Sequence, residues 1–404
     1  MPMAGFALDD RQRLDWLRLI RSESIGPRTF RTLVNRFGGA AGALDALPEL
    51  GRQAGRTLRL CTAIEAEREL EALRRRGTHL IALGEATYPV PLQAIDSAPP
   101  LIAIEGDPAV LNRPCVALVG SRNASAAGLK FTATLARELG EAGFVVVSGL
   151  ARGIDTTAHQ ASLENGTIAV LAGGLDEVYP PQNIPLIDRI RERGAALSEM
   201  PIGWAPRGRD FPRRNRLVSG LALGTVVVEA ARKSGSLITA RFANEQGRQV
   251  FAVPGSPLDP RAEGGNHLIR EGAILCAETA HVVDALTPML RRGDLFDPAP
   301  FLAREEGEPR GRQEALWDEL ELPDVLPAPT AELNGDELGT RPTAQAGDTS
   351  HRRLLDLIGS TPVAMDDLVR ASGRPAREVS RILLELELEG VVQRHVGGAL
   401  SRLA

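Results

Sequence analysis

The chain has 404 residues, which is enough for two or three domains. Its 43% hydrophobic and 25% charged residues are typical of a soluble globular protein, and no apolar run approaches the ~20 residues of a membrane span. The N-terminus shows no signal-peptide pattern and the three cysteines are widely spaced, so we expect a cytoplasmic protein with buried thiols, no membrane contact and no metal site.

The net charge of −5 is concentrated in one segment. Residues 294–349 carry −10, whereas residues 1–293 carry +4 and residues 350–404 carry +1. The acidic segment is also rich in Pro and Gly and poor in apolar residues, so we expect residues 294–349 to form a disordered linker. The rest of the chain is therefore compatible with an anionic partner.

Residues 1–78 are predicted to form a small helical domain. Apolar residues at helical spacing lie on both sides of a Gly26-Pro27 turn, which opens a short basic helix. This turn is typical of one half of a helix-hairpin-helix or SAM-like domain, in which backbone amides hold a DNA phosphate. A domain that serves only for packing is an equal alternative, because the second hairpin is not evident.

Residues 79–293 are predicted to form an α/β core, a Rossmann-like, doubly wound and mostly parallel sheet. Short apolar strands alternate here with segments of helix length, and runs such as Val145–Val147 and Val226–Val228 suit strands that are buried on both faces. The expected strands have the sequences HLIAL, PLIAIEG, CVALVG, FVVVSG, TIAVLAG, ALSEM, GTVVVEA and QVFAVPG.

Residues 350–404 are predicted to form a winged-helix domain with three helices and a two-stranded wing around Gly397-Gly398. Its expected recognition helix carries Arg377 and Arg381, but four glutamates accompany them. This balance disfavours strong DNA binding by the domain, and a protein partner is an equal alternative.

Ligands of an open parallel sheet bind at the carboxyl ends of its strands, so the turns after the strands are the candidate sites. In the first turn Gly120 allows a close backbone approach, Ser121 can cap the next helix and Arg122 can pair with a phosphate. The pattern is not GxGxxG, which argues against a nicotinamide cofactor. The second turn carries Gly149 and Arg152.

The second turn also leads into Asp155 and His159, which lie four residues apart on one helix face. They could form an acid/base pair or ligate a metal ion. Helix capping by Asp155 and a structural role for His159 are favoured, because no third ligand has a fitting spacing.

The next candidates follow in a loop and an arginine-rich segment. Tyr179 stands beside prolines and Phe211 beside arginines, so either ring could stack on a base or simply pack. Arginine pairs well with phosphate oxygens, and five arginines lie within ten residues here. They are Arg207, Arg209, Arg213, Arg214 and Arg216. Ser234, Gly235 and Ser236 then open a helix. Four such turns together predict an extended phosphate-tracking surface, hence a polynucleotide rather than a nucleotide cofactor.

These motifs, in this order, resemble the DNA-processing protein A family (DprA, also called Smf) over nearly the whole chain. The resemblance rests on VALVGSR at 116–122, SGLARGID at 148–155, YPPQN at 179–183, SEMPIG at 198–203, FPRRNRLVSGL at 211–221, VVVEAARKSGSLITA at 226–240, AVPG at 252–255 and GGNHLIREGA at 264–273. One departure is Pro181, where the family often has a lysine, so a phosphate contact there is lost or supplied elsewhere.

The resemblance implies a dimeric single-stranded-DNA-binding recombination mediator that loads the RecA recombinase during natural transformation. It places Gly120, Ser121 and Arg122 in the DNA pocket, with Arg152, Asn183, Arg214, Asn215 and Arg216. It also places His267, Leu268 and Ile269 near the dimer contact. No catalytic motif is evident, so we expect neither enzymatic activity nor a cofactor.

Two other functions stay open. The GTVVVEA stretch is similar to the nucleotide-cleaving Rossmann proteins of the LOG family, in which Glu229 would be a catalytic carboxylate. A transcription regulator that acts through the winged helix is the second alternative.

Overall fold

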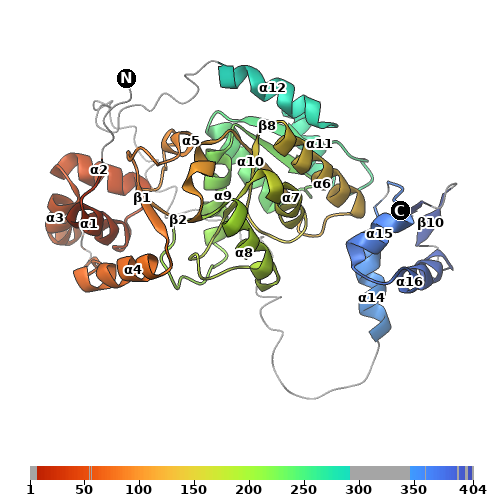
Figure 1. The fold of residues 1–404 in the computed structure, drawn as a ribbon, viewed down its shortest axis with the longest axis horizontal. Helices are drawn as coiled ribbons and strands as arrows, with labels where there is room; N and C mark the ends of the chain where they lie inside the picture. Colours follow the sequence, from red (N-terminus) through yellow and green to blue (C-terminus); the bar gives the residue numbers. More distant parts are fainter. Residues whose placement is uncertain are drawn as a thin grey trace.

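The structure is a computed structural model that describes residues 7–291, except 54 and 56, and residues 346–402, except 360, 389–390 and 396–398. A helical domain, a sheet core and a C-terminal domain follow one another along the chain (Figure 1). The predicted linker at 294–349 lies almost entirely outside the described residues. No helix in the described ranges is long and apolar enough to cross a membrane.

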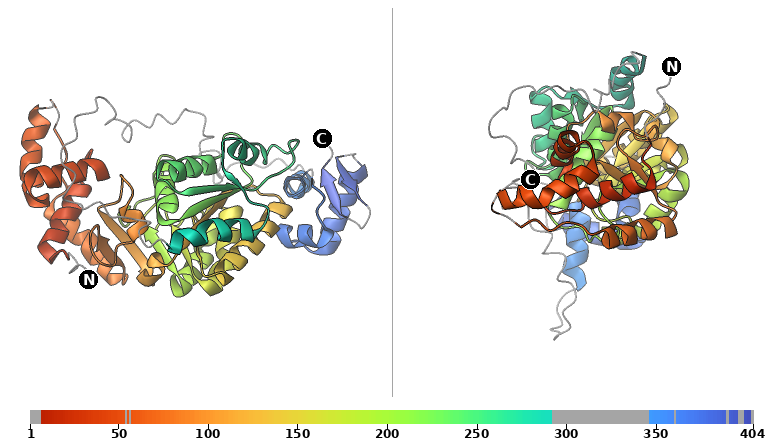
Figure 2. Two further views of the ribbon diagram at one scale, coloured as in Figure 1. Left: turned by 90° about the horizontal axis from the view of Figure 1, so that it is seen from above. Right: turned by 90° about the vertical axis from the view of Figure 1, so that its left-hand side faces the viewer.

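The N-terminal domain consists of four helices, as the apolar spacing predicts. They are α1 (Asp10–Ile20), α2 (Pro27–Phe37), α3 (Ala40–Gln53) and α4 (Ala63–Arg75). Asp9 and Thr62 cap α1 and α4 through capping boxes, and Pro27 opens α2 directly after Gly26. Trp16 and Phe30 meet edge to face at 5.0 Å in its core. Figure 2 shows this domain at one end of the molecule and the C-terminal domain at the other.

The core is built on a nine-stranded sheet of order β1-β2-β6-β5-β4-β3-β7-β8-β9. The strands are β1 (His79–Ala82), β2 (Leu101–Gly106), β3 (Cys115–Gly120), β4 (Val145–Ser148), β5 (Thr167–Val170), β6 (Ala195–Ser198), β7 (Gly224–Val228), β8 (Gln249–Ala252) and β9 (Ile274–Leu275). The pairs from β6 to β9 are parallel, whereas β1 and β2 add an antiparallel edge. The predicted doubly wound, mostly parallel sheet is therefore confirmed.

Helices cover both faces of the sheet, which explains why its central strands are uniformly apolar. They are α5 (Val90–Gln93), η1 (Pro108–Asn112), α6 (Ala126–Glu141), α7 (Ile154–Ser162), η2 (Leu163–Asn165), η3 (Pro181–Asn183), α8 (Ile184–Arg193), α9 (Asp210–Leu221), α10 (Gly235–Glu245), α11 (Glu263–Arg270) and α12 (Thr279–Arg291). The chain leaves β3 toward β4 on one side and returns through β7 on the other. The switch point of the sheet, where ligands of such folds bind, therefore lies between β3 and β7.

The C-terminal domain has the predicted winged-helix architecture. It consists of α14 (Ala346–Asp356), α15 (Met365–Ser372), α16 (Ala376–Leu388), β10 (Val392–Arg394) and β11 (Leu400–Arg402). Its apolar core joins α14, α15 and α16 through residues such as Leu354, Leu368 and Ile382, and β10 pairs antiparallel with β11 as the wing. Helix α14 begins four residues before the boundary expected at residue 350.

Candidate nucleic-acid interface

The carboxyl ends of β3 and β4 bring two glycine-bearing turns together: the β3 turn at residues 120–122 and the β4 turn at residues 149–152. Gly120 closes β3 so near to β7 that a Cβ atom on it would lie 1.9 Å from the Val228 carbonyl oxygen. Gly153 follows the β4 turn with a φ of 74°, and a Cβ atom there would lie 2.4 Å from the Ser121 carbonyl oxygen. Only glycine fits these positions, so both turns are held at close range to each other.

Arg214 of α9 is buried against the β4 turn. Its Nη1 donates to the carbonyl oxygens of Gly149 and Val170. A Cβ atom on Gly149 would lie 2.4 Å from that Nη1, which accounts for the glycine. Burial lowers the pKa of Arg214 from 12.5 to about 10, so the side chain stays protonated at neutral pH.

The buried carboxylate of Asp155 fixes the backbone of the β4 turn through hydrogen bonds. Its carboxylate accepts from the backbone N–H groups of Gly149 at 3.1 Å and Ala151 at 3.3 Å, while Leu150 between them has a φ of 59°. Burial raises the pKa of Asp155, and the Arg214 charge and the two N–H donors oppose that rise. The turn is therefore held in place, and Arg152 projects from a fixed base.

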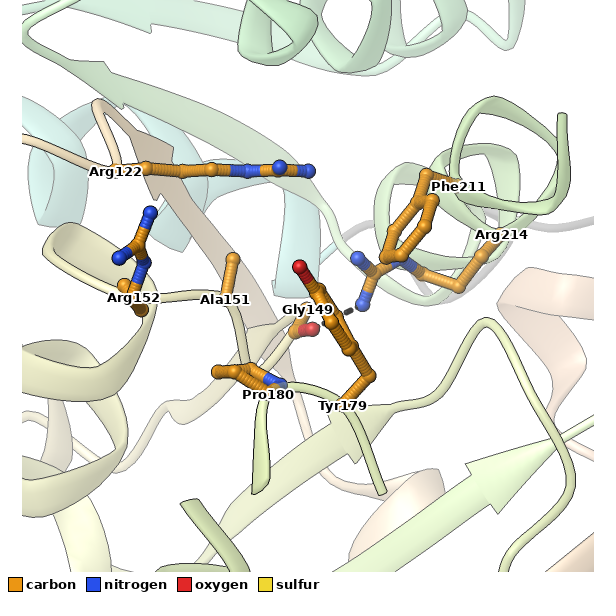
Figure 3. A pocket seen from close by; sticks show the side chains of 8 residues that line it. All are labelled: Arg122, Gly149, Ala151, Arg152, Tyr179, Pro180, Phe211 and Arg214. Atoms are coloured by element: carbon orange, nitrogen blue, oxygen red, sulfur yellow. Dashed lines mark hydrogen bonds between the residues drawn. The ribbon is translucent and has the colours of Figure 1, made fainter. Parts of the chain in front are cut away.

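A shallow pocket opens between these turns, the loop before α8 and the start of α9 (Figure 3). Arg122 and Arg152 lie at one side of it, and Arg214, Tyr179 and Phe211 at the other. Arg122 and Arg152 are exposed at its mouth, whereas Arg214 forms part of its wall. The lining contains three arginines and no carboxylate, so the pocket favours an anion.

Aromatic rings form the second half of the pocket wall. Tyr179 and Phe211 meet edge to face with their centroids 5.6 Å apart, and the Arg122 guanidinium carbon lies 5.4 Å from the Phe211 centroid. An adjoining hollow shares both rings, Gly149 and Arg214 with the pocket. Cations beside flat apolar rings suit a ligand that carries both a phosphate and a base.

Several residues predicted at the site lie away from the pocket. Arg216 is 2% exposed, donates to the Ser97 carbonyl oxygen at 2.6 Å and forms an ion pair with Glu199. Asn215 donates to the Gly235 carbonyl oxygen at 3.3 Å, and Ser234 caps α10 through the Ser236 N–H. These residues connect α9 to its neighbours, so we propose no direct DNA contact for Arg216 and an indirect role for the others.

Asn183 and Ser121 are near the pocket but have structural partners. The Asn183 side-chain amide donates to the Leu150 carbonyl oxygen and to the Thr156 hydroxyl, both at 2.8 Å. Asn183 therefore positions the β4 turn. The expected cap by Ser121 is wrong: Ser125 caps α6 by accepting from the Gly128 N–H at 3.0 Å, while Ser121 accepts from the Asn123 N–H at 3.1 Å.

His159 and Glu229 are buried or engaged. The His159 side chain is fully buried, its Nδ1 lies 2.8 Å from the Thr167 hydroxyl, and burial lowers its pKa from 6.5 to about 3. The expected helix cap by Asp155 is wrong, because Gly153 is the N-cap of α7 and Asp155 binds the preceding turn instead. Both side chains have structural partners, which favours a structural role over an acid/base pair. Glu229 has a φ of 52°, and its carboxylate accepts from the Ser125 N–H and hydroxyl at the start of α6. Among the described residues, no group of three or more His, Cys, Asp or Glu could hold a metal ion.

Three family models match in chain order. "DprA-like N-terminal HHH domain" matches residues 10–72, "DNA recombination-mediator protein A" residues 79–287 and "DprA winged helix domain" residues 339–398. The chain belongs to the DprA family. The helical domain is therefore of the helix-hairpin-helix kind that the Gly26-Pro27 turn indicates.

Relatives within the DprA family match over most of their length. Protein Smf of Synechocystis sp. is 32% identical and covers 96% of this chain and 98% of its own. Protein Smf of Escherichia coli is 34% identical and covers 95% and 94%. The X-ray structure of DprA from Streptococcus pneumoniae is 35% identical, with a TM-score of 0.54, and covers 65% of this chain and 87% of that one.

Sequence reasoning missed part of the wall of this pocket. Tyr179, Pro180 and Ala151 line it, and Glu177 and Pro206 line the adjoining hollow. Tyr179 was open to either stacking or packing from its sequence alone. Its position opposite Phe211 depends on where its loop meets the start of α9, which no local pattern reports.

Proposed function

We propose that the chain is a non-enzymatic recombination mediator that binds single-stranded DNA in the pocket between the β3 and β4 turns. The observation that carries this proposal is the combination of exposed Arg122 and Arg152 with the rings of Tyr179 and Phe211 around one opening. Arginines attract phosphates of any sequence, and rings stack on any base. Binding should therefore be sequence-tolerant.

The aromatic rings in the pocket wall also explain why the protein should prefer single-stranded to double-stranded DNA. In a duplex the nucleobases are paired and stacked inside the helix. The two rings in the pocket wall therefore have no free nucleobase to stack on. An unpaired nucleotide can place its phosphate near Arg122 and Arg152 and its base near Phe211. Duplex DNA retains only the phosphate contacts and binds more weakly.

The wider biological role rests on family membership. We propose that the protein loads RecA on incoming strands during natural transformation, acts in the cytoplasm and forms a homodimer. The dimer contact is proposed at His267, Leu268 and Ile269 of α11, beside β9 at the edge of the sheet, where Leu275 is 42% exposed. An exposed apolar edge of this kind favours a second copy.

Equilibrium binding to single- and double-stranded oligonucleotides over a series of salt concentrations tests the proposal. We expect tighter binding to the single strand at every salt concentration, and a logarithmic affinity that falls linearly with the logarithm of salt. Equal affinity for both forms would contradict the aromatic half of the site. RecA assembly on strands coated with single-strand-binding protein, with and without this protein, tests the loading role.

A nucleotide-cleaving enzyme is the second candidate, and the position of Glu229 disfavours it. Its carboxylate is engaged with Ser125 at the α6 N-terminus, which is where a nucleotide phosphate would bind in a Rossmann fold. Release of free base from nucleoside monophosphates by the purified protein, abolished in Glu229→Gln, would support the enzyme instead.

Regulation of transcription through the winged helix is the third candidate. The first half of α16 carries Arg377 and Arg381, but Arg381 pairs with Glu385, and Arg374 just before the helix pairs with Glu378. These pairs reduce the charge available to duplex DNA. A duplex footprint that disappears with Arg377→Ala would favour this reading.

A further inference from the structure

The C-terminal domain contacts the core at the first turn of α6. The Ala126 N–H, which has no acceptor within its own helix, donates to the Leu357 carbonyl oxygen at 3.0 Å. Ala126 is 2% exposed and belongs to the same apolar cluster as Leu354 and Ile358. Figure 1 shows α14 and α15 on the α6 side of the core. The start of α6 is thus completed by the other domain.

Two charged contacts flank this apolar seam. Arg261 is held by Asp259 through its Nε at 3.1 Å and Nη2 at 3.2 Å, and it donates to the carbonyl oxygens of Asp356 at 2.7 Å and Ile358 at 3.4 Å. Those carbonyls lie at the C-terminal end of α14, where a cation is favourable. On the other flank, Lys130 of α6 forms a 2.9 Å ion pair with Asp367 of α15.

The contact lies next to the loop that carries Arg122. The loop runs from the end of β3 to the Ser125 cap, so only four positions separate Arg122 from Ala126. At the start of the loop, the Ser121 carbonyl oxygen accepts a hydrogen bond from the Ile154 N–H at 3.2 Å. At its end, the Ser125 N–H donates to the Glu229 carboxylate. Leu357 adds a restraint at the end of the loop that belongs to another domain.

We propose that the start of α6, together with Arg261, is a docking site for the C-terminal domain of the same chain, and that docking braces the Arg122 loop. The contacts come from the C-terminal end of α14, the two residues after it and α15. A loop that is ordered before DNA arrives loses less conformational freedom on binding. Docking should therefore strengthen the single-stranded-DNA site, a consequence that rests on the function proposed above.

Hydrogen–deuterium exchange of the DNA-free, full-length protein tests the docking itself. Lys130→Asp and Arg261→Ala should each speed exchange in the peptide spanning residues 123–130 by roughly tenfold, because the Ala126 N–H loses its acceptor when the domain leaves. Lys130→Asp combined with Asp367→Lys should restore slow exchange. Arg137→Asp makes the same kind of charge reversal on an exposed side chain of the same helix and should have no effect.

Protection of the buried Ile382 and Leu383 amides reports whether the domain stays folded in each variant. Unchanged exchange at residues 123–130 in both Lys130→Asp and Arg261→Ala, with that protection intact, would overturn the docking site. Exchange that depends on protein concentration would overturn docking within one chain and assign the contact to a second copy.

Single-stranded-DNA affinity then tests the bracing. Lys130→Asp and Arg261→Ala should weaken binding by about threefold, and the charge-swapped pair should restore it. Faster exchange with unchanged affinity would overturn the bracing. Absence of DNA binding in the unaltered protein would instead contradict the proposed function, and the exchange result would stand on its own.

Discussion

Replacing Arg122 by alanine removes an exposed cation at the mouth of the pocket and little else. Its side chain projects over Phe211 at 5.4 Å and is exposed, so the fold does not depend on it. A charge-assisted contact to one phosphate at such a site contributes roughly tenfold in affinity, about 1.4 kcal/mol. One lost contact should also reduce the slope of logarithmic affinity against logarithmic salt by about 0.7 for a single strand.

Fluorescence anisotropy with labelled oligo-dT and with a mixed sequence, at several salt concentrations, measures both effects. The loss should be the same for both sequences because a phosphate carries no sequence information. Arg241→Ala is the matched control: Arg241 also lies over a ring, 5.6 Å from the Phe242 centroid, but outside the pocket. If Arg122→Ala binds with the affinity and salt slope of the Arg241→Ala control, Arg122 is not a phosphate ligand and the reasoning fails.

Three further changes separate binding from stability. Phe211→Leu should weaken single-stranded-DNA binding by roughly fivefold or more for every sequence while the salt slope stays unchanged, because stacking is lost and no charge is removed; a changed slope in the titration would contradict this. Arg214→Met should cost about 3 kcal/mol in the free energy of unfolding, measured with urea, because two buried carbonyls and Asp155 lose their partner; a loss below about 0.5 kcal/mol would show that the guanidinium is not structural. Burial lowers the pKa of His159 from 6.5 to about 3, so below pH 6.5 the unfolded chain takes up a proton that the folded chain does not, and stability should fall by up to about 1.4 kcal/mol per pH unit as the pH drops toward 3. His159→Gln should remove that part of the pH dependence, and parallel curves for both proteins would refute it.

The sheet was largely predictable because its central strands are covered on both faces. Eight strands appear in the sequence as continuous apolar runs, and each is found. Strand β9 escaped prediction because two residues carry no periodicity. The antiparallel direction of β1 and β2 is also invisible locally, since it is decided by the distant strand with which each pairs.

The pocket was easiest to predict where glycine and arginine stand together in one turn. Gly149 and Arg152 after β4 are such a pair, and Arg122 follows Gly120 after β3. The arginine-rich segment was harder, because it forms helix α9 and successive side chains point in different directions. Arg214 and Arg216 are two residues apart, hence about 200° apart around the helix. One faces Gly149 and the other faces Ser97 and Glu199, a difference that a run of arginines does not reveal.

Photo-cross-linking of a single strand that carries 5-iodouracil, followed by mass spectrometry of the peptides, tests the central claim most directly. The base should cross-link to peptides that contain Tyr179 or Phe211, because these two rings face the opening between Arg122 and Arg152. An excess of unlabelled single strand should abolish the cross-links, and the same excess of duplex should not. Cross-links confined to residues 7–78 or 346–402 would contradict the account.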